Sequence, residues 1–163
     1  MALFQPQEFD FSDTKTYDVW ERHNLVRIDN LCNLSDPVEL YPSEELRAVS
    51  EKILEARKNG RPVIVFYGAH VIKCGLSRYL IDLIKRGLIT HIASNGAGSI
   101  HDFELAYLGG TSEHVPTAIE DGSFGMWEQT GGWMNEAIRQ GFEKGYGYGE
   151  ALAHYVDEHP DRF

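Results

Sequence analysis

Residues 62–108 read PVIVFYGAHVIKCGLSRYLIDLIKRGLITHIASNGAGSIHDFELAYL, and this stretch decides the fold. It contains two short apolar runs, residues 62–67 and 88–93, and each is followed by a predicted glycine-containing loop and a helical pattern. A continuous apolar run rich in β-branched residues is typical of a strand buried on both faces of a parallel sheet. Strand, crossover helix and strand fit into about 30 residues, the length of a βαβ unit. The sequence therefore predicts two parallel strands with a right-handed connection.

Helices are predicted on both sides of these strands. Ser43 is a suitable N-cap, and Leu46, Val49 and Ile53 form an apolar stripe that ends before Gly60, so a helix is expected there. The remaining predicted helices lie at residues 76–86, 100–108, within 111–121, at 126–144 and at 150–158.

The domain expected from these elements is incomplete. Residues 1–40 are interpreted as an irregular lead-in, and residues 41–163 as a partial Rossmann-like α/β domain, a parallel sheet with flanking helices. Two parallel strands bury too little surface to be stable alone. Further strands would come from a partner chain or from a longer domain of which this chain is the front part, and we expect the second.

Composition excludes several classes of function. The chain has 163 residues and a formal net charge of -10, without a basic stripe, so nucleic acid is not an expected partner. No apolar run is long enough to cross a membrane, and residues 1–13 do not form a secretory signal. The two cysteines form no disulfide framework, which favours the cytoplasm. An acidic protein suits a cationic substrate such as a polyamine.

Two segments that follow the predicted strands are candidates for ligand binding. Residues 68–75 and 94–99 should meet at the carboxyl edge of the sheet, where ligands bind in open α/β sheets. Asn95, Gly96, Ala97 and Gly98 lead into a helix N-terminus, which is suited to phosphate, although the third glycine of the GxGxxG fingerprint is missing. The alternative is a tight structural turn. In the first segment, His70 and Lys73 are candidate polar contacts or ordinary solvated residues.

His101 and Asp102 follow the second segment. With His70 they allow a hypothesis of metal-dependent hydrolysis, but no histidine spacing places two ligands on one helix face, and no metal site is expected. Without a metal ion, the Asp102 carboxylate would be stabilised by the helix dipole near the start of the predicted helix, or it would face a cationic ligand. Further along, Trp127 lies in a segment of acids, glycines and aromatics that could bind an amine by cation–π contact, although packing is the preferred interpretation.

The residues of this region resemble a known family. Residues 63–76 (VIVFYGAHVIKCGL) and 92–109 (IASNGAGSIHDFELAYLG) are similar to the deoxyhypusine synthase family, and more closely to its bacterial deoxyhypusine-synthase-like branch. The resemblance is strongest over about residues 60–110. It implies a Rossmann-like fold, NAD as cofactor, a homotetramer, and transfer of the aminobutyl group of spermidine to a lysine of a translation factor.

The resemblance also assigns roles to residues. Ala69 and His70 match the first NAD loop, Asn95 to Ala97 match a Thr-Ala-Gly loop that contacts NAD, and His101 with Asp102 is expected on the substrate side. The family has Ser-Asn in place of Ala69-His70 and a glutamate in place of His101. Its catalytic lysine has no counterpart here, so catalysis by this chain alone is in doubt. We therefore expect the NAD-binding part of an NAD-dependent aminobutyl transferase; the alternative is a non-catalytic assembly or binding module.

Overall fold

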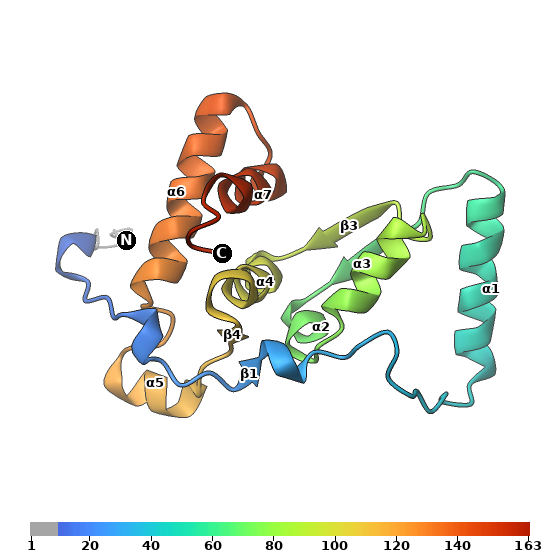
Figure 1. The fold of residues 1–163 in the computed structure, drawn as a ribbon, viewed down its shortest axis with the longest axis horizontal. Helices are drawn as coiled ribbons and strands as arrows, with labels where there is room; N and C mark the ends of the chain where they lie inside the picture. The colour runs from blue at the N-terminus through green and yellow to red at the C-terminus, as the bar shows by residue number, and fades with distance from the viewer. Residues whose placement is uncertain (1–9) are drawn as a thin grey trace, which may run out of the picture. The chain divides into compact units, whose positions relative to one another are not determined.

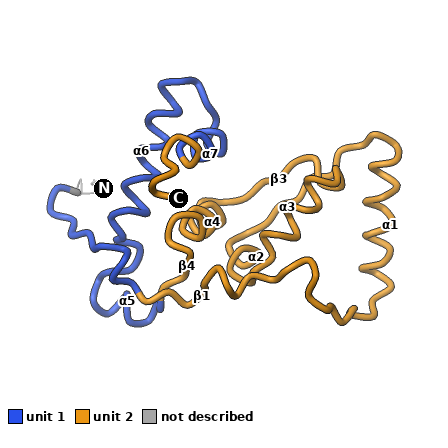
Figure 2. Tube along the Cα trace, in the orientation of Figure 1, with its two compact units in different colours: residues 1–22, 114–155 blue, residues 23–113, 156–163 orange. Residues whose placement is uncertain are grey.

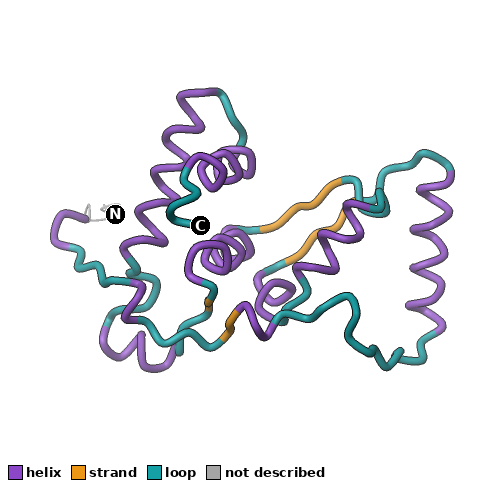
Figure 3. Tube along the Cα trace, viewed as in Figure 1, coloured by secondary structure: helices purple, strands orange, loops and turns teal. Residues whose placement is uncertain are grey.

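The computed structural model describes residues 10–163 and has a mixed α/β fold that is mostly helical, as Figures 1 and 3 show. The helices are α1 (Glu44–Lys58), α2 (Ala69–Lys73), α3 (Ser77–Lys85), α4 (Gly96–Leu108), α5 (Val115–Asp121), α6 (Glu128–Lys144) and α7 (Tyr148–Glu158). The strands are β1 (Val26–Arg27), β2 (Ile64–Tyr67), β3 (His91–Ser94) and β4 (Gly110–Thr111), and short 3-10 turns occur at η1 (Phe11–Asp13), η2 (Val19–Glu21) and η3 (Ile28–Asn30).

The chain forms two compact units, which Figure 2 distinguishes by colour. Among the described residues, unit 1 comprises residues 10–22 and His114–Tyr155, and unit 2 comprises His23–Glu113 and Val156–Phe163. Helix α7 begins in unit 1, and its last residues belong to unit 2. Within residues 10–163, no helix combines the length and the apolar character that a bilayer crossing requires.

The expected pair of parallel strands is confirmed in unit 2. Strands β2 and β3 pair in parallel, with Ile64 opposite His91 and Tyr67 opposite Ser94, and helices α2 and α3 lie between them in the chain. A second, antiparallel pair joins β1 to β4 and was not expected, because each of these strands has only two residues.

The prediction that the first strand is buried on both faces was wrong. Ile64 is 50% exposed and Phe66 is 80% exposed, and both side chains lie on the same face because alternate residues of a strand do. Tyr67, on the opposite face, packs against a cluster of Leu31, Ile72 and Leu105. In the described part of the chain, helices therefore cover one face of β2 and leave the other open.

The two segments predicted as loops are largely helical, which is a second correction. Residues 69–73 form α2, and α4 begins at Gly96 instead of near Ile100. Gly68 and Asn95 have extended backbones and act as the N-caps, so each helix starts directly after a strand. The glycines near Asn95 suggested a loop because glycine is a poor helix former, but they occupy the first turn of α4.

Helix α1 was predicted correctly at both ends. The Ser43 side chain accepts a hydrogen bond from the Leu46 N–H (3.2 Å), and Gly60 has a positive φ of 67° just beyond the last turn. Its apolar stripe is nevertheless not buried: Leu46 and Val49 are exposed.

Unit 1 has its own core, formed by η2, α6 and α7. Val19, Met134 and Tyr155 are buried, and the Tyr155 hydroxyl donates to Glu136 Oε2 (2.6 Å). The Arg22 guanidinium lies over the Trp127 ring, 5.3 Å from its centroid. Trp127 thus packs against a cation of its own unit, which agrees with the interpretation that it is a packing residue.

Candidate functional site

The ends of β2 and β3 lie next to each other in unit 2. Tyr67 and Ser94 are register partners, and the Ser94 hydroxyl donates to the Tyr67 carbonyl oxygen (2.9 Å). Helix α2 begins two residues after Tyr67, and α4 begins two residues after Ser94. The register thus brings both predicted segments to one edge of the sheet, and Figure 1 shows the two strands running side by side toward these helices.

The first turn of α4 offers main-chain hydrogen-bond donors at this edge. The Asn95 side chain accepts a hydrogen bond from the Gly98 N–H (3.2 Å), so that donor is satisfied within the helix cap. For the N–H groups of Gly96 and Ala97, no acceptor lies within hydrogen-bond distance among residues 10–163. Two adjacent N–H groups at the positive end of a 13-residue helix form a suitable environment for an anion.

The three glycines at this edge, Gly68, Gly96 and Gly98, differ in whether neighbouring atoms leave room for a side chain. A Cβ atom on Gly98 would lie 2.2 Å from Ser94 Oγ, so a side chain there would displace the Ser94 hydroxyl from its hydrogen bond to the Tyr67 carbonyl oxygen. A Cβ atom on Gly96 or on Gly68 would meet nothing within 4 Å. Packing therefore explains Gly98, whereas Gly96 and Gly68 leave open space beside the strand ends.

The other residues expected to contact the cofactor lie on α2. Ala69 is half-buried and His70 is exposed, in the first turn of this short helix, and Lys73 is half-buried at its end. They start from the same edge as Asn95 and Gly96, so the structure brings the two expected NAD segments together.

The residues expected on the substrate side lie further along α4. Asp102 is exposed, yet neighbouring protein atoms displace part of its solvent, and this desolvation raises the pKa of its carboxyl group. His101 is half-buried, and its Nδ1 atom lies 2.7 Å from the Thr111 Oγ1 atom of β4. Thr111 was not expected as a neighbour of His101, because β4 and its pairing with β1 were not predicted.

The buried Glu104 was also missed by sequence reasoning. It lies three residues after His101 on α4, and Thr111 Oγ1 donates to its Oε2 atom (2.5 Å). One signal was present in the sequence, because Glu104 stands between the apolar residues Phe103 and Leu105. The structure shows that both of these neighbours are buried. A carboxylate in an apolar stretch of helix needs a buried partner, and here that partner is Thr111.

No three His, Cys, Asp or Glu side chains in the described residues converge on a point where a metal ion could bind. His70, His101 and Asp102 in particular form no such group, so the structure gives no support to metal-dependent hydrolysis through these three residues.

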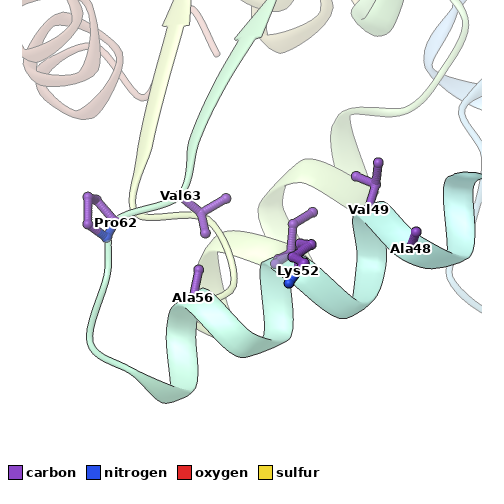
Figure 4. A pocket seen from close by; sticks show the side chains of 7 residues that line it. Ala48, Val49, Lys52, Ala56, Pro62 and Val63 are labelled. Atoms are coloured by element: carbon purple, nitrogen blue, oxygen red, sulfur yellow. The ribbon is translucent and has the colours of Figure 1, made fainter.

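An apolar hollow lies elsewhere in unit 2, between α1 and the start of β2. Figure 4 shows the helix side chains Val49, Lys52 and Ala56 facing Pro62 and Val63. Because Pro62 and Val63 precede β2, this hollow is at the amino end of the strand, opposite to the edge where α2 and α4 begin. It therefore does not belong to the expected cofactor site.

Comparisons of the chain with protein-family models, with curated proteins and with solved structures find no match.

Proposed function

We propose that the edge formed by the ends of β2 and β3 binds NAD, and that the chain is the NAD-binding part of a Rossmann-like, deoxyhypusine-synthase-like protein. The observation that carries this proposal is the pairing of Tyr67 with Ser94, because it puts two helix starts at one sheet edge. Parallel strands followed by helices have their ligand sites at this edge. The Gly96 and Ala97 N–H groups would hold the pyrophosphate, with Ala69 and His70 beside it.

The reaction that we propose for the complete protein is transfer of an aminobutyl group from a polyamine to an amine acceptor. NAD, when bound, would supply a hydride acceptor. The contribution of this chain would be to hold the cofactor and, through His101 and Asp102, to face the amine substrate. The acidic balance of the chain supports a cationic substrate. This sequence has no counterpart of the family's catalytic lysine, so the part proposed for it is binding and not the transfer step.

The first prediction tests the anion site through Ala97. Glutamate at this position places a carboxylate in the first turn of α4, where the helix dipole stabilises it by about 0.3–1 kcal/mol. The same carboxylate would repel a bound pyrophosphate. We therefore expect Ala97→Glu to weaken NAD binding at least tenfold, about 1.4 kcal/mol, without loss of stability.

Calorimetric titration with NAD and urea unfolding measure the two effects, and Ala97→Gln serves as the uncharged control of the same size. Saturable binding to the wild-type protein and to Ala97→Gln, with loss in Ala97→Glu, supports the site. Folded wild-type protein that shows no binding, or equal binding by both variants, would contradict it.

The alternative function, an assembly module, is favoured by one specific observation. The face of β2 that carries Ile64 and Phe66 is open, and contiguous exposed apolar surface marks interaction sites. We propose a second copy of this chain as the partner, since like sheets pack through like faces in symmetric dimers. This function needs no cofactor.

The second prediction tests whether Phe66 lies in an interface between two copies of the chain or is simply an exposed side chain. Phe66→Glu should convert an oligomer into a monomer in light scattering, because it places a charge at the centre of the interface. Phe142 on α6 is 82% exposed, close to the 80% of Phe66, so Phe142→Glu is the matched control and should leave the oligomer intact. A wild-type monomer, or dissociation by both variants, would exclude assembly through this face.

A further inference from the structure

The two cysteines of the chain are 42 residues apart in the sequence but are neighbours in unit 2. Cys32 lies two residues after η3, and Cys74 is the C-cap residue of α2. The Cys32 Sγ atom lies 3.9 Å from the Cys74 carbonyl oxygen, so standard bond lengths place it at most about 6.7 Å from the Cys74 Cα atom. This spacing is within reach of a disulfide, which joins residues whose Cα atoms are up to about 6.8 Å apart.

The main chain holds the two cysteines close together. The Cys32 N–H donates a hydrogen bond to the Gly75 carbonyl oxygen (3.0 Å). Gly75 is buried and has a φ of 82°, and a Cβ atom on it would lie 3.1 Å from both the Cys32 nitrogen and the Leu31 Cα atom. Glycine at this position therefore lets the two backbone segments approach each other directly. The proximity of the cysteines thus depends on the backbone and not on one side-chain rotamer.

The residues on either side of Cys32 are also fixed in place. Leu31 is buried in a cluster with Ile72 of α2. Arg78 of α3 donates to the Leu31 carbonyl oxygen (3.2 Å) and to the Asn33 side chain. The segment that carries Cys32 is therefore bound to α2 and α3 on both sides of the thiol. Two groups held in this way react with each other far faster than two groups on a mobile chain.

The two thiols differ in their access to solvent. Cys74 is exposed, whereas Cys32 is half-buried. A thiol can exchange with a dissolved disulfide only if the reagent reaches it, so access favours Cys74 as the first to react. Cys32 lies beside Cys74 and is therefore placed to react second.

We propose that Cys32 and Cys74 form a reversible disulfide when the protein meets a small-molecule disulfide as oxidant. The Cys74 sulfur attacks one sulfur of the oxidant, releases one small thiol and forms a mixed disulfide. The Cys32 sulfur then attacks the Cys74 sulfur and releases the second small thiol. The two protein thiols lose two electrons and two protons. The oxidant gains both electrons, and the protons end on the two thiols that are released.

The disulfide closes a ring that contains α1 and β2. Closing a ring of this length stabilises the folded protein, because it restricts the unfolded chain. In reducing compartments, disulfides of this kind are usually transient and respond to oxidants. The bond would therefore strengthen the attachment of the segment before α1 when oxidants are present and release it when they are removed. This proposal is independent of the proposed NAD site.

The third prediction is tested with oxidised glutathione and mass spectrometry of the intact protein and its peptides. The wild-type protein should lose both free thiols, carry a bond between Cys32 and Cys74, and retain no glutathione. Cys32→Ser should retain one glutathione on Cys74, because the second thiol is missing. Cys74→Ser should react at least tenfold more slowly than Cys32→Ser, because Cys32 is half-buried.

Two further measurements test the role of the fold and the effect of the bond. Unfolding the wild-type protein in urea before glutathione is added should slow formation of the bond between Cys32 and Cys74 at least tenfold. Oxidation should move the unfolding of the wild-type protein to higher urea concentration and leave that of Cys74→Ser unchanged, and dithiothreitol should reverse the shift.

Three results would overturn the proposal. Folded wild-type protein that retains glutathione without the internal bond, or that forms the bond no faster than the unfolded chain, would show that the two thiols are not held together. An oxidised protein that unfolds at the same or at lower urea concentration would exclude a stabilising bond. Equal reaction rates of Cys32→Ser and Cys74→Ser would overturn the order of attack.

Discussion

At the scale of single residues, Asp102 combines exposure with partial desolvation. Its pKa is raised above the ordinary value of 3.8 because neighbouring atoms of the folded protein disfavour the charged carboxylate. A carboxyl group with a raised pKa in the folded state contributes its full stability below pH 3.8 and loses it as the pH rises through the folded pKa. At neutral pH, the ionised Asp102 is therefore a cost to stability that a ligand cation could offset.

The fourth prediction follows from the destabilising effect of the ionised Asp102 carboxylate at neutral pH. Asp102→Asn should stabilise the protein at pH 7 by a few tenths of a kcal/mol, a small value because solvent screens an exposed group. The gain should disappear toward about pH 2.8, one pH unit below the ordinary value of 3.8, where the aspartic acid is almost fully protonated in both states. Urea unfolding at the two pH values measures the difference.

Asp121 provides the control for Asp102→Asn. The side chain and backbone of Ser123 lower the pKa of its carboxyl group by hydrogen bonding, so Asp121→Asn should not stabilise the protein at pH 7. A pH-independent gain in Asp102→Asn, or an equal gain in both variants, would show that desolvation of Asp102 is not the cause.

At the scale of elements, α6 and α7 are in close contact at Gly141. A Cβ atom there would lie 2.2 Å from the Cβ atom of Ala151, so the two helices of unit 1 pack through glycine and alanine. Gly132 belongs to the same helix, but a Cβ atom on it would meet nothing within 4 Å. Close packing therefore excludes a larger side chain at position 141 of α6 but not at position 132.

The fifth prediction compares these two positions. Gly141→Ala should destabilise the protein by about 1–3 kcal/mol, because the extra methyl group overpacks the contact with Ala151. Gly132→Ala should stabilise it by about 0.5–1 kcal/mol, because alanine is the better helix former. Urea unfolding measures both changes, and stabilisation by both substitutions would show that α6 and α7 do not pack closely at Gly141.

The elements that could be predicted from the sequence are those with local signals. Helix α1 has an N-cap at Ser43 and a glycine at position 60, and both were identified correctly. The start of α4 was placed too late because Gly96 and Gly98 suggested a loop. Gly98 is glycine for a tertiary reason, its contact with Ser94, which a local pattern cannot reveal.

At the scale of the whole molecule, the long-range pairings could not be predicted. β1 and β4 have two residues each and are far apart in the sequence, so neither shows a strand pattern. Thr111 therefore remained hidden, and with it the partner of His101. The sheet edge at the ends of β2 and β3 could be predicted because it depends only on two strand–helix units that follow each other in the sequence. The buried Glu104 could not, since burial of a charged residue depends on the rest of the fold.

The division of unit 2 into two separate segments has a consequence for synthesis on the ribosome. The ring of Phe163 packs edge-on against Phe103 and Tyr107 of α4, with centroids 5.1 Å and 6.0 Å away. Phe163 emerges only after all of residues 114–155 of unit 1 have been made. At about 5–20 residues per second, the aromatic side chains of α4 lack their contact with Phe163 for several seconds during synthesis. During that interval the nascent α4 is a surface on which chaperones could act.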